Sequence, residues 1–490
     1  MPSSKDPRSR SVIAAVWLWL LLLVAAAVPG AAAARPGDRD PTFGDGGEVV
    51  TPFLRLTNVM AIDAHGRILV GGDTLESFVA PPGRLARYDA SGRLDPTFGV
   101  GGIAEVPPGR RPAYLGDIAF AADGRALVAA TTTVEVNGSE TRDAIVVVRL
   151  EEDGRTDLSF ANGEIFVQAD DLDYSLRNPQ ILVYDDGRVS VASLVCDAWG
   201  CPGVALFRFT SDGAPLGSGL TLDGIRDLRD PTRVHLRSDD RLWLTARSVS
   251  VFGYELVLVD LDTDGEYGGR IPTNLALTRF QMPTTVLDDD DRLLAVGTID
   301  GDVAVQRFLP HGRLDPAYAT TPIPPAVNRR PEASVIAVQP DGRAIIGGSL
   351  GVFRGSADWL LTMLLPDGGI DESFGTEGRV ERLTRNVGDH VRHVGVQPDG
   401  RIVVLGHVGS SVVLARYAGS TRVCGDADGD GTLTVTDGVR VLRASADLPS
   451  SCLTDFCDVD ANGSTTVTDG VRVLRAAAAL PATLECAPAH

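Results

Sequence analysis

The sequence has almost no lysine and no excess of positive charge. Among its 490 residues Lys5 is the only lysine, and the formal net charge is −20. A chain this acidic does not attract nucleic acid through a surface that neutralises phosphates, so we expect no nucleic-acid partner. Glycine and proline are abundant instead, with 54 and 30 residues, and they favour many turns and short strands over long helices.

Long apolar runs are also lacking, except for one near the N-terminus, from Val12 to Val28. A basic segment, Lys5 to Arg10, precedes this run, and the small residues Ala31 to Ala34 follow it, as in a secretory signal peptide. An uncleaved membrane anchor is the alternative, although the run is at the short end of what spans a bilayer. We expect residues 1–34 to be removed as a signal peptide. The mature protein is then secreted or held at the cell surface, with no transmembrane segment.

Cysteine is scarce, and none of the six cysteines has the CxxC spacing of a zinc or redox site. In an exported protein such cysteines are candidates for disulfides. Cys196 and Cys201 lie in one short segment, CDAWGC, and we expect them to bridge each other. The other four can pair in three ways, and the sequence does not choose among them. They are Cys424, Cys452, Cys457 and Cys486.

Internal repeats fill the chain between residues 40 and 420. The first repeated phrase is a turn, Asp-Gly-Arg in most copies, followed by a short β-rich strand. Its arginines are 51 to 63 residues apart, and two copies, Asp240-Arg241 and Asp291-Arg292, lack the glycine. The seven arginines are Arg67, Arg125, Arg188, Arg241, Arg292, Arg343 and Arg401.

A second phrase alternates with the first and reads RLDPTFGVGG at residues 93–102. Related copies occupy residues 39–47, 155–163, 313–319 and 369–378. Strand-like runs separate the phrases, at residues 84–88, 145–150, 204–209, 255–261, 303–308, 359–364 and 411–417.

The two phrases predict an all-β propeller. Asp-Gly supplies the positive φ of a tight hairpin, and the β-branched and aliphatic runs supply its strands. Each repeat then holds about four short strands, a sheet that buries both faces only by stacking on its neighbours. Seven copies predict seven blades over residues 35–420. The repeat region starts with the second phrase at Asp40 and ends with a strand just before that phrase would recur. We therefore expect the N-terminal strand to complete the last blade.

We expect no catalytic residue in the repeats. The segment GGSLG at 347–351 matches a nucleophile elbow, but Ser349 leads into a loop, whereas an elbow needs a helix. The histidines between His390 and His407 have no carboxylate at metal-ligand spacing, which favours solvated positions at strand ends. The acidic run 288–291 falls at a hairpin turn. Because the Asp and Arg residues of the phrases recur in copy after copy, we expect them to bond within the fold rather than form one site.

The phrases resemble the delta-sixty repeat family, whose signature is Asp-Gly-Arg/Lys, a strand, an Arg-Tyr strand and Leu-Asp-x-x-Phe-Gly. Copies one, two, six and seven match this signature, and copies three to five depart from it. The resemblance implies a propeller with no assigned activity.

The C-terminal part contains two twelve-residue segments, 426–437 and 458–469, offset by 32 residues. Calcium takes six to eight oxygens, which such a loop supplies from positions 1, 3, 5, 7 and 12, with glycine at position 6 for the sharp turn. Gly431 and Gly463 stand at position 6, so the sequence predicts two Ca²⁺ ions. The expected ligands are Asp426, Asp428, Asp430, Thr432 and Asp437 in the first loop, and Asp458, Asp460, Asn462, Ser464 and Asp469 in the second.

Each loop leads directly into an expected helix, from Asp437 to Ala444 and from Asp469 to Ala476. Val439 and Leu442 fall on one face of the first helix, as do their counterparts 32 residues later, so these faces are expected to pack together. An EF-hand would have a helix before each loop and usually Glu at position 12, and this chain has Asp there and no room for an entering helix.

The tandem pattern over residues 423–490 resembles a type I dockerin. The resemblance implies docking to a cohesin-like module of a scaffold or cell surface, often in polysaccharide-degrading complexes. Positions 10 and 11, where partner choice is usually made, are Val435-Thr436 and Val467-Thr468, identical in both halves. Four cysteines bracketing the loops are unusual for such modules, and a calcium-stabilised cap without a docking partner is the alternative.

We therefore expect a secreted, non-catalytic binding or display protein, with a propeller followed by a small α calcium-binding loop-helix module. The propeller would take a carbohydrate or protein ligand, which the sequence does not name. The rival interpretation is an extracellular enzyme or accessory protein of polysaccharide degradation. It is suggested only by the complexes in which dockerins often occur.

Overall fold

The computed structural model describes most of the chain from residue 35 onward. The expected signal peptide, residues 1–34, lies outside the described residues. Described are residues 35–52, 54, 56–73, 83–107, 113–121, 123–136, 140–168, 175–197, 200–217, 219–221, 228–250, 253–262, 267–277, 284–300, 302–320, 322–323, 330–351, 357–382, 389–419, 424–427, 433–446, 448, 450, 452 and 457–486.

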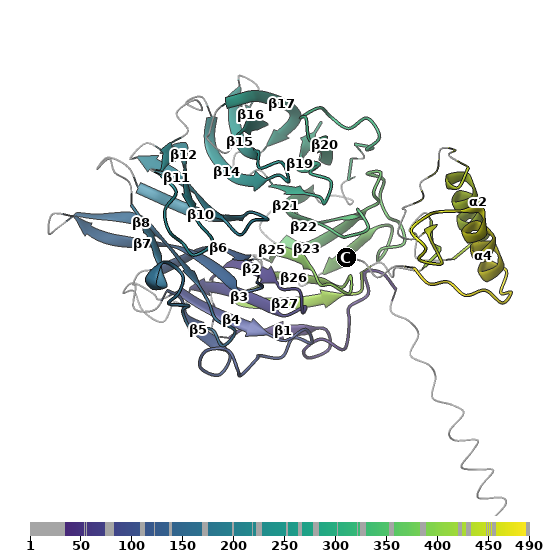
Figure 1. The fold of residues 1–490 in the computed structure, drawn as a ribbon, viewed down its shortest axis with the longest axis horizontal. Coiled ribbons are helices and arrows are strands. Elements are labelled where there is room, and N and C mark those ends of the chain that lie inside the picture. The colour runs from purple at the N-terminus through teal and green to yellow at the C-terminus, as the bar shows by residue number, and fades with distance from the viewer. Residues whose placement is uncertain are drawn as a thin grey trace, which may run out of the picture. The chain divides into compact units, whose positions relative to one another are not determined.

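Strands make up the part between residues 48 and 417, as the short β-rich runs predict (Figure 1). They are β1 (Glu48–Val50), β2 (Leu56–Ile62), β3 (Ile68–Asp73), β4 (Gly83–Tyr88), β5 (Ile103–Glu105), β6 (Ala113–Phe120), β7 (Ala126–Val136), β8 (Glu140–Arg149), β9 (Ile165–Val167), β10 (Ser175–Val183), β11 (Val189–Asp197), β12 (Gly200–Phe209), β13 (Leu220–Thr221), β14 (Leu228–Leu236), β15 (Leu242–Ser250), β16 (Gly253–Leu261), β17 (Tyr267–Leu277), β18 (Thr284–Leu287), β19 (Leu293–Ile299), β20 (Asp302–Phe308), β21 (Arg330–Val338), β22 (Ala344–Gly351), β23 (Ala357–Leu364), β24 (Arg379–Arg382), β25 (His390–Val396), β26 (Ile402–Val408) and β27 (Ser411–Tyr417). A short 3-10 turn, η1 (Ala161–Gly163), lies between β8 and β9.

The strands form antiparallel sheets of consecutive hairpins, an all-β propeller-like fold. Among the described residues there are six hydrogen-bonded sheets, five of four strands and one of seven. The seven-stranded sheet runs from β14 to β20, and its two halves meet only at the pair Ala276–Thr298, between β17 and β19. The first strands of the repeats, which we call the inner strands, contact one another in a closed order: β2, β6, β10, β14, β18, β21, β25 and back to β2.

The first repeated phrase forms the hairpin turn that its sequence predicts. Gly124 has φ +81°, and its N–H donates to the carbonyl oxygen of Ala121. In the two copies without glycine, Asp240 and Asp291 take the same left-handed conformation, with φ of 62° and 58°. Asp is among the few non-glycine residues that enter this region readily, which explains how these copies keep the turn.

The two ends of the repeat region meet in one sheet. β1 pairs with β27, with Glu48 opposite Ala415 and Val50 opposite Val413 (Figure 1). The prediction that the N-terminal segment completes the last sheet is therefore confirmed. A shared apolar core follows, in which side chains of the first repeat, such as Ile68, pack with residues of the last, such as Val403.

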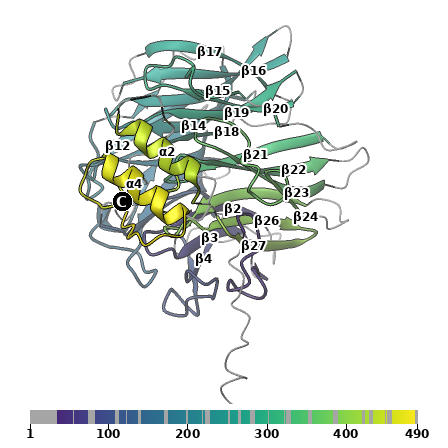
Figure 2. The ribbon, with the colours of Figure 1, turned by 90° about the vertical axis from the view of Figure 1, so that its right-hand side faces the viewer.

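The C-terminal module contains the helices α2 (Val435–Ala444) and α4 (Val467–Ala477), which lie side by side (Figure 2). A Cβ atom on Gly438 would lie 2.4 Å from Cγ of Leu474, and one on Gly470 would lie 2.5 Å from Cγ of Leu442. The helices thus pack by two equivalent contacts that only glycine permits.

One detail of the expected helix packing is wrong. Val439 and Val471 are 47% and 46% exposed, whereas Val441 and Val473 are fully buried. Glycine brings the two backbones close together, and this rotates the neighbouring valines outward while turning Val441 and Val473 toward the loops. The small core also contains Ala427 and Val459.

All described cysteine side chains are in disulfides. The structure selects one of the three possible pairings in the module, Cys424–Cys486 and Cys452–Cys457. Cys196 is also disulfide-bonded and lies at the end of the β11–β12 hairpin. Within the described part of the chain, no helix is both long and apolar enough to cross a membrane.

Candidate metal centre

The position-12 aspartates are built into the start of each helix. Thr466 precedes α4 and forms a capping box with Asp469, in which the N–H of Thr466 donates to Oδ2 of Asp469 at 2.8 Å. The hydroxyl of Thr466 also donates to this oxygen, at 2.7 Å. The N–H of Val459 donates to Oδ1 of the same carboxylate at 3.1 Å. Asp469 is therefore fixed by hydrogen bonds at both oxygens, and its side chain is fully buried.

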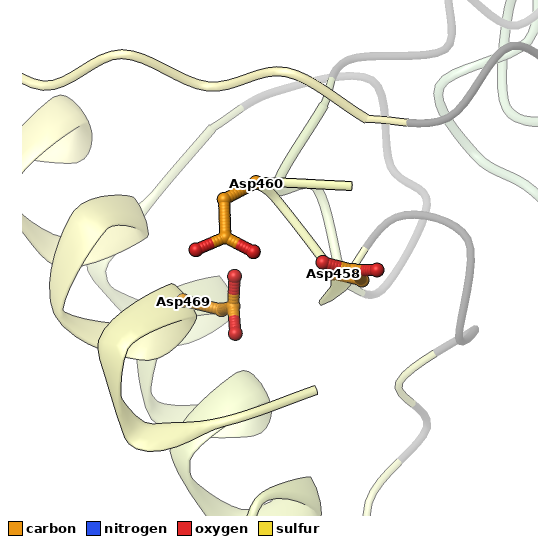
Figure 3. Close-up of side chains that lie close together, drawn as sticks. All are labelled: Asp458, Asp460 and Asp469. Atoms are coloured by element: carbon orange, nitrogen blue, oxygen red, sulfur yellow. The ribbon is translucent and has the colours of Figure 1, made fainter. Parts of the chain in front are cut away.

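Three carboxylates of the second loop converge. Asp458, Asp460 and Asp469 each place one oxygen within 4.8 Å of the others (Figure 3). The N–H groups of Asn462 and Gly463 donate to Asp458 at 3.1 and 2.6 Å, so the loop curls around this side chain.

The pKa of Asp458 is lowered. Burial acts to raise it, but hydrogen bonds from the backbone N–H groups of Gly463, Asn462 and Asp460 outweigh this effect. The carboxylate form is thereby favoured, as a metal ligand requires. Arg472, on α4, lies 3.3 Å from Oδ2 of Asp460 and supplies the cationic contact of this cluster.

The first loop repeats the geometry where it is described. Oδ1 of Asp437 accepts from the N–H of Ala427 at 3.0 Å, and Oδ2 accepts from the N–H and hydroxyl of Thr434 at 2.7 Å each. Asp426 is buried, like Asp458. The other expected ligands of this loop lie outside the described residues: Asp428, Asp430 and Thr432.

The residues of the second loop fit a hard divalent cation. One oxygen of each of three carboxylates lies within 4.8 Å of the others, and oxygen is the donor that calcium prefers. Asn462 lies in the same loop, and its side-chain oxygen accepts the N–H of Ser464 at 3.1 Å. Among the residues described, this is the one group of three acidic, histidine or cysteine side chains close enough to hold a metal ion.

The charged residues of the propeller phrases have a different use. In four repeats an arginine pairs with the phrase's aspartate at 2.7–2.9 Å and lies 4.5–4.8 Å over the centre of its aromatic ring. The four units are Arg87–Asp95–Phe98, Arg149–Asp157–Phe160, Arg307–Asp315–Tyr318 and Arg416–Asp40–Phe43.

Each unit also reaches the following repeat. Arg149 donates to the carbonyl of Ser211 at 3.0 Å, and Arg307 donates to that of Pro366 at 2.8 Å. Arg416, in the last strand, donates to the carbonyl of Ala90 in the first repeat. The expectation that these repeated residues bond within the fold is confirmed.

The remaining motifs of the repeats lie as follows. Ser349 is within β22, paired with β21 and β23, and not at a strand-to-helix turn. Asp288 is part of the expected turn and pairs with Arg292 at 2.7 Å. The expectation of solvated histidines is wrong for His407, which is 8% exposed, stacks on His390 and accepts a hydrogen bond from Trp359 at its carbonyl oxygen.

Sequence reasoning missed the polar residues of the inner strands. Oδ2 of Asp117 accepts the N–H of Ile181 at 2.8 Å, and Oε1 of Gln180 accepts the N–H of Val234 at 2.9 Å. These bonds join neighbouring repeats, but the residues belong to neither repeated phrase, so no recurrence in the sequence marks them.

Comparison with protein families supports the fold. Residues 66–98 and 339–374 match a family described as "Domain of unknown function (DUF5122) beta-propeller". Each match begins in or beside the first phrase and ends in the second, so the repeats carry it. No curated protein matches the sequence.

Solved structures of other proteins share the arrangement only loosely. Virginiamycin B lyase from Staphylococcus aureus is 13% identical, with a TM-score of 0.43 over 76% of this chain and 98% of that one. Drosophila Plexin A in complex with Semaphorin 1b is 10% identical, with a TM-score of 0.41 over 82% and 91%. At these values nothing about chemistry or ligands transfers to this chain.

Proposed function

We propose that this chain is an exported, non-catalytic binding or display protein, in which a calcium-binding, dockerin-like module attaches a propeller of delta-sixty-type repeats to a scaffold or cell surface. The observation that carries the proposal is the convergence of Asp458, Asp460 and Asp469, together with the matching geometry of Asp437 in the first loop.

Calcium is the ion that this donor set favours. Asp426, Asp437, Asp458, Asp460 and Asp469 would act through carboxylates. Asp428, Asp430 and Asn462 complete positions 3 and 5 of the pattern, and Thr432 and Ser464 would offer carbonyl oxygens. The bound ion would neutralise acids that otherwise repel one another, so it would stabilise the module.

Seven blades are the count that we propose for the propeller. The seven inner strands contact one another in a closed order, which supports one blade for each. The seven-stranded sheet divides at its single Ala276–Thr298 pair into β14–β17 and β18–β20. On this division every copy of the first phrase has a blade of its own.

Exposed apolar side chains support docking over a simple cap. Val435 and Val467 are 56% and 59% exposed, and Val439 and Val471 are also exposed. Each pair is related by the 32-residue offset, so the module presents the same apolar and threonine-bearing surface twice. A protein partner would bury these side chains, and their repetition in both halves supports a docking surface.

The first experiment measures calcium and cohesin binding by the full chain. Calorimetry is expected to show two bound Ca²⁺ per chain, and a type I cohesin module is expected to bind only when calcium is present. The variant V439E/V471E should keep calcium and lose the cohesin. Val100 and Leu158, 89% and 74% exposed in the propeller, provide the matched control V100E/L158E, which should keep both.

The outcomes separate the two parts of the proposal. Calcium binding without capture of cohesin would leave a calcium-stabilised cap. No calcium binding by the folded chain would overturn the proposal as a whole.

A further inference from the structure

The inner strands line an open cavity of the size that holds a small molecule. Its volume is about 610 Å³, within the range of small-ligand sites. A second hollow of about 470 Å³ shares several of its lining residues. Every inner strand contributes to the larger hollow, through Met60, Asp117, Gln180, His235, Thr285, Ser334 and Arg392.

Bulges in the inner strands shape this lining. The register of β25 shifts between Val391 and His393, so Arg392 is the extra residue. A similar irregularity in β14 ends at Arg233, and one in β10 contains Asn178, which has φ +49°. Bulges redirect side chains and are frequent beside binding sites.

Most polar groups of the lining are already used to join repeats. Asp117 and Gln180 accept backbone N–H groups of the neighbouring strand, as described above. Nε2 of His235 lies 2.7 Å from Oγ1 of Thr285, and the hydroxyl of Ser334 donates to the carbonyl of Val391 at 3.0 Å. These groups hold the wall together and are not free to bind a ligand strongly.

Arg233 and Arg392 are different. Both line the two hollows and both are exposed. Among the residues that the structure describes, neither guanidinium makes a hydrogen bond or an ion pair, unlike the arginines of the repeated phrases. Asp117 is the one acidic residue named in either lining. Two guanidinium groups against one carboxylate make the lining cationic in a chain whose net charge is −20.

We infer that this cavity binds a small solute carrying an oxyanion, a carboxylate or a phosphate, between Arg233 and Arg392. A guanidinium donates two parallel N–H groups that match the geometry of such an oxyanion. Asn178 and Thr131 also line the smaller hollow, and their side chains would offer hydrogen bonds to a hydroxylated body, such as that of an acidic sugar.

The test is calorimetric titration of the full chain, in Tris-chloride buffer, with glucuronate, glucose 1-phosphate, inorganic phosphate and neutral glucose. At least one oxyanion should bind, glucose should not, and the affinity should fall as salt is added. Binding of glucuronate alone identifies a carboxylate site, and binding of either phosphate compound identifies a phosphate site.

The variant R233Q/R392Q should bind the same probe at least about tenfold more weakly. Arg93 and Arg313 are exposed residues of the second phrase, and R93Q/R313Q makes the same change in net charge outside the cavity. This control should bind like the native chain. R392K should retain part of the affinity, because lysine keeps the positive charge but lacks the two parallel N–H donors of a guanidinium.

Equal unfolding midpoints of the two double variants would exclude misfolding as the cause. The inference is overturned if no oxyanion binds the native chain, or if R233Q/R392Q binds as tightly as R93Q/R313Q.

Discussion

The propeller and the C-terminal module are both built from short repeats rich in aspartate and glycine, but they balance their charges differently. In four propeller repeats the aspartate of the second phrase meets an arginine of the neighbouring strand, as Asp157 meets Arg149 at 2.7 Å. In the second C-terminal loop three aspartates meet one another, and one arginine, Arg472, touches the edge of the cluster.

This difference separates structural charge from binding charge. A carboxylate that is paired within its own repeat contributes to stability and has little attraction left for an ion. Carboxylates that converge without equal positive charge repel one another, and a cation relieves the repulsion. The same contrast distinguishes the phrase arginines from Arg233 and Arg392.

The largest expected effect lies at the seam where the propeller closes. Arg416 is 4% exposed, pairs with Asp40 at 2.9 Å and lies over Phe43. R416Q should lower the free energy of unfolding by about 3–5 kcal/mol, because it removes the buried partner of Asp40 together with the hydrogen bond to Ala90 and the contact with Phe43. Urea denaturation measures the change.

Arg401 gives the matched control, since it also pairs with Asp40, at 3.0 Å, but is 44% exposed. R401Q should cost less than about 1 kcal/mol. If R416Q and R401Q lost the same free energy of unfolding, burial would not determine how much these ion pairs stabilise the fold.

In the module, removal of one ligand should affect both binding and stability. D469A should abolish calcium binding at the second of the two proposed loops. It should also cost roughly 2–4 kcal/mol without calcium, because the capping box and the bond from Val459 are lost. Calorimetry and chelator-dependent denaturation measure the two effects. Thr468 is exposed and is not an expected ligand, so T468A should change neither calcium binding nor stability. Unaltered calcium binding in D469A would contradict the assignment of Asp469 as a calcium ligand.

A pH titration sharpens the comparison within the propeller. Burial acts to raise the pKa of Asp157, but hydrogen bonds from Ser159 and Arg149 outweigh it and lower the pKa to about 2. The unfolded value is about 3.9, so the stabilisation is present above that pH and is lost as the pH falls toward 2.

This loss should be on the order of 2 kcal/mol. The free energy of unfolding, measured by denaturation, should therefore fall less between pH 5 and pH 3 in D157N than in the native chain. Asp367, in an exposed turn, serves as control, and D367N should keep the native difference. An unchanged difference in D157N would show that Asp157 does not carry this stabilisation.

The smallest expected effect concerns the hairpin turns. Gly124 has φ +81° and open space around the missing Cβ, so G124A should cost only the strain of a left-handed alanine, about 1–2 kcal/mol. G124N should cost less, because Asp240 and Asp291 already adopt this conformation at equivalent turns. Thermal unfolding measures both, and equal losses would mean that side-chain type does not matter at this turn.

Much of this architecture could be predicted because it is local and repeated. Asp-Gly turns, alternating strand runs and the closing N-terminal phrase recur at regular spacing, and each has a short-range physical cause. The loop pattern likewise predicts that Asp458 and Asp469 lie in one cluster. The expectation that Val439 and Val471 pack between the helices is wrong, because their exposure depends on the glycine contacts between α2 and α4.

The sequence by itself determined the β-repeat fold, the seam between its ends and the residues of the second acidic cluster, since turn geometry and loop spacing act over a few residues. Only the tertiary structure decided the pairing of Cys424 with Cys486, the burial of His407 and the placement of Arg233 and Arg392 in the lining of one cavity. These features join residues distant along the chain, and the packing of whole sheets and helices, rather than any local preference, brings them together.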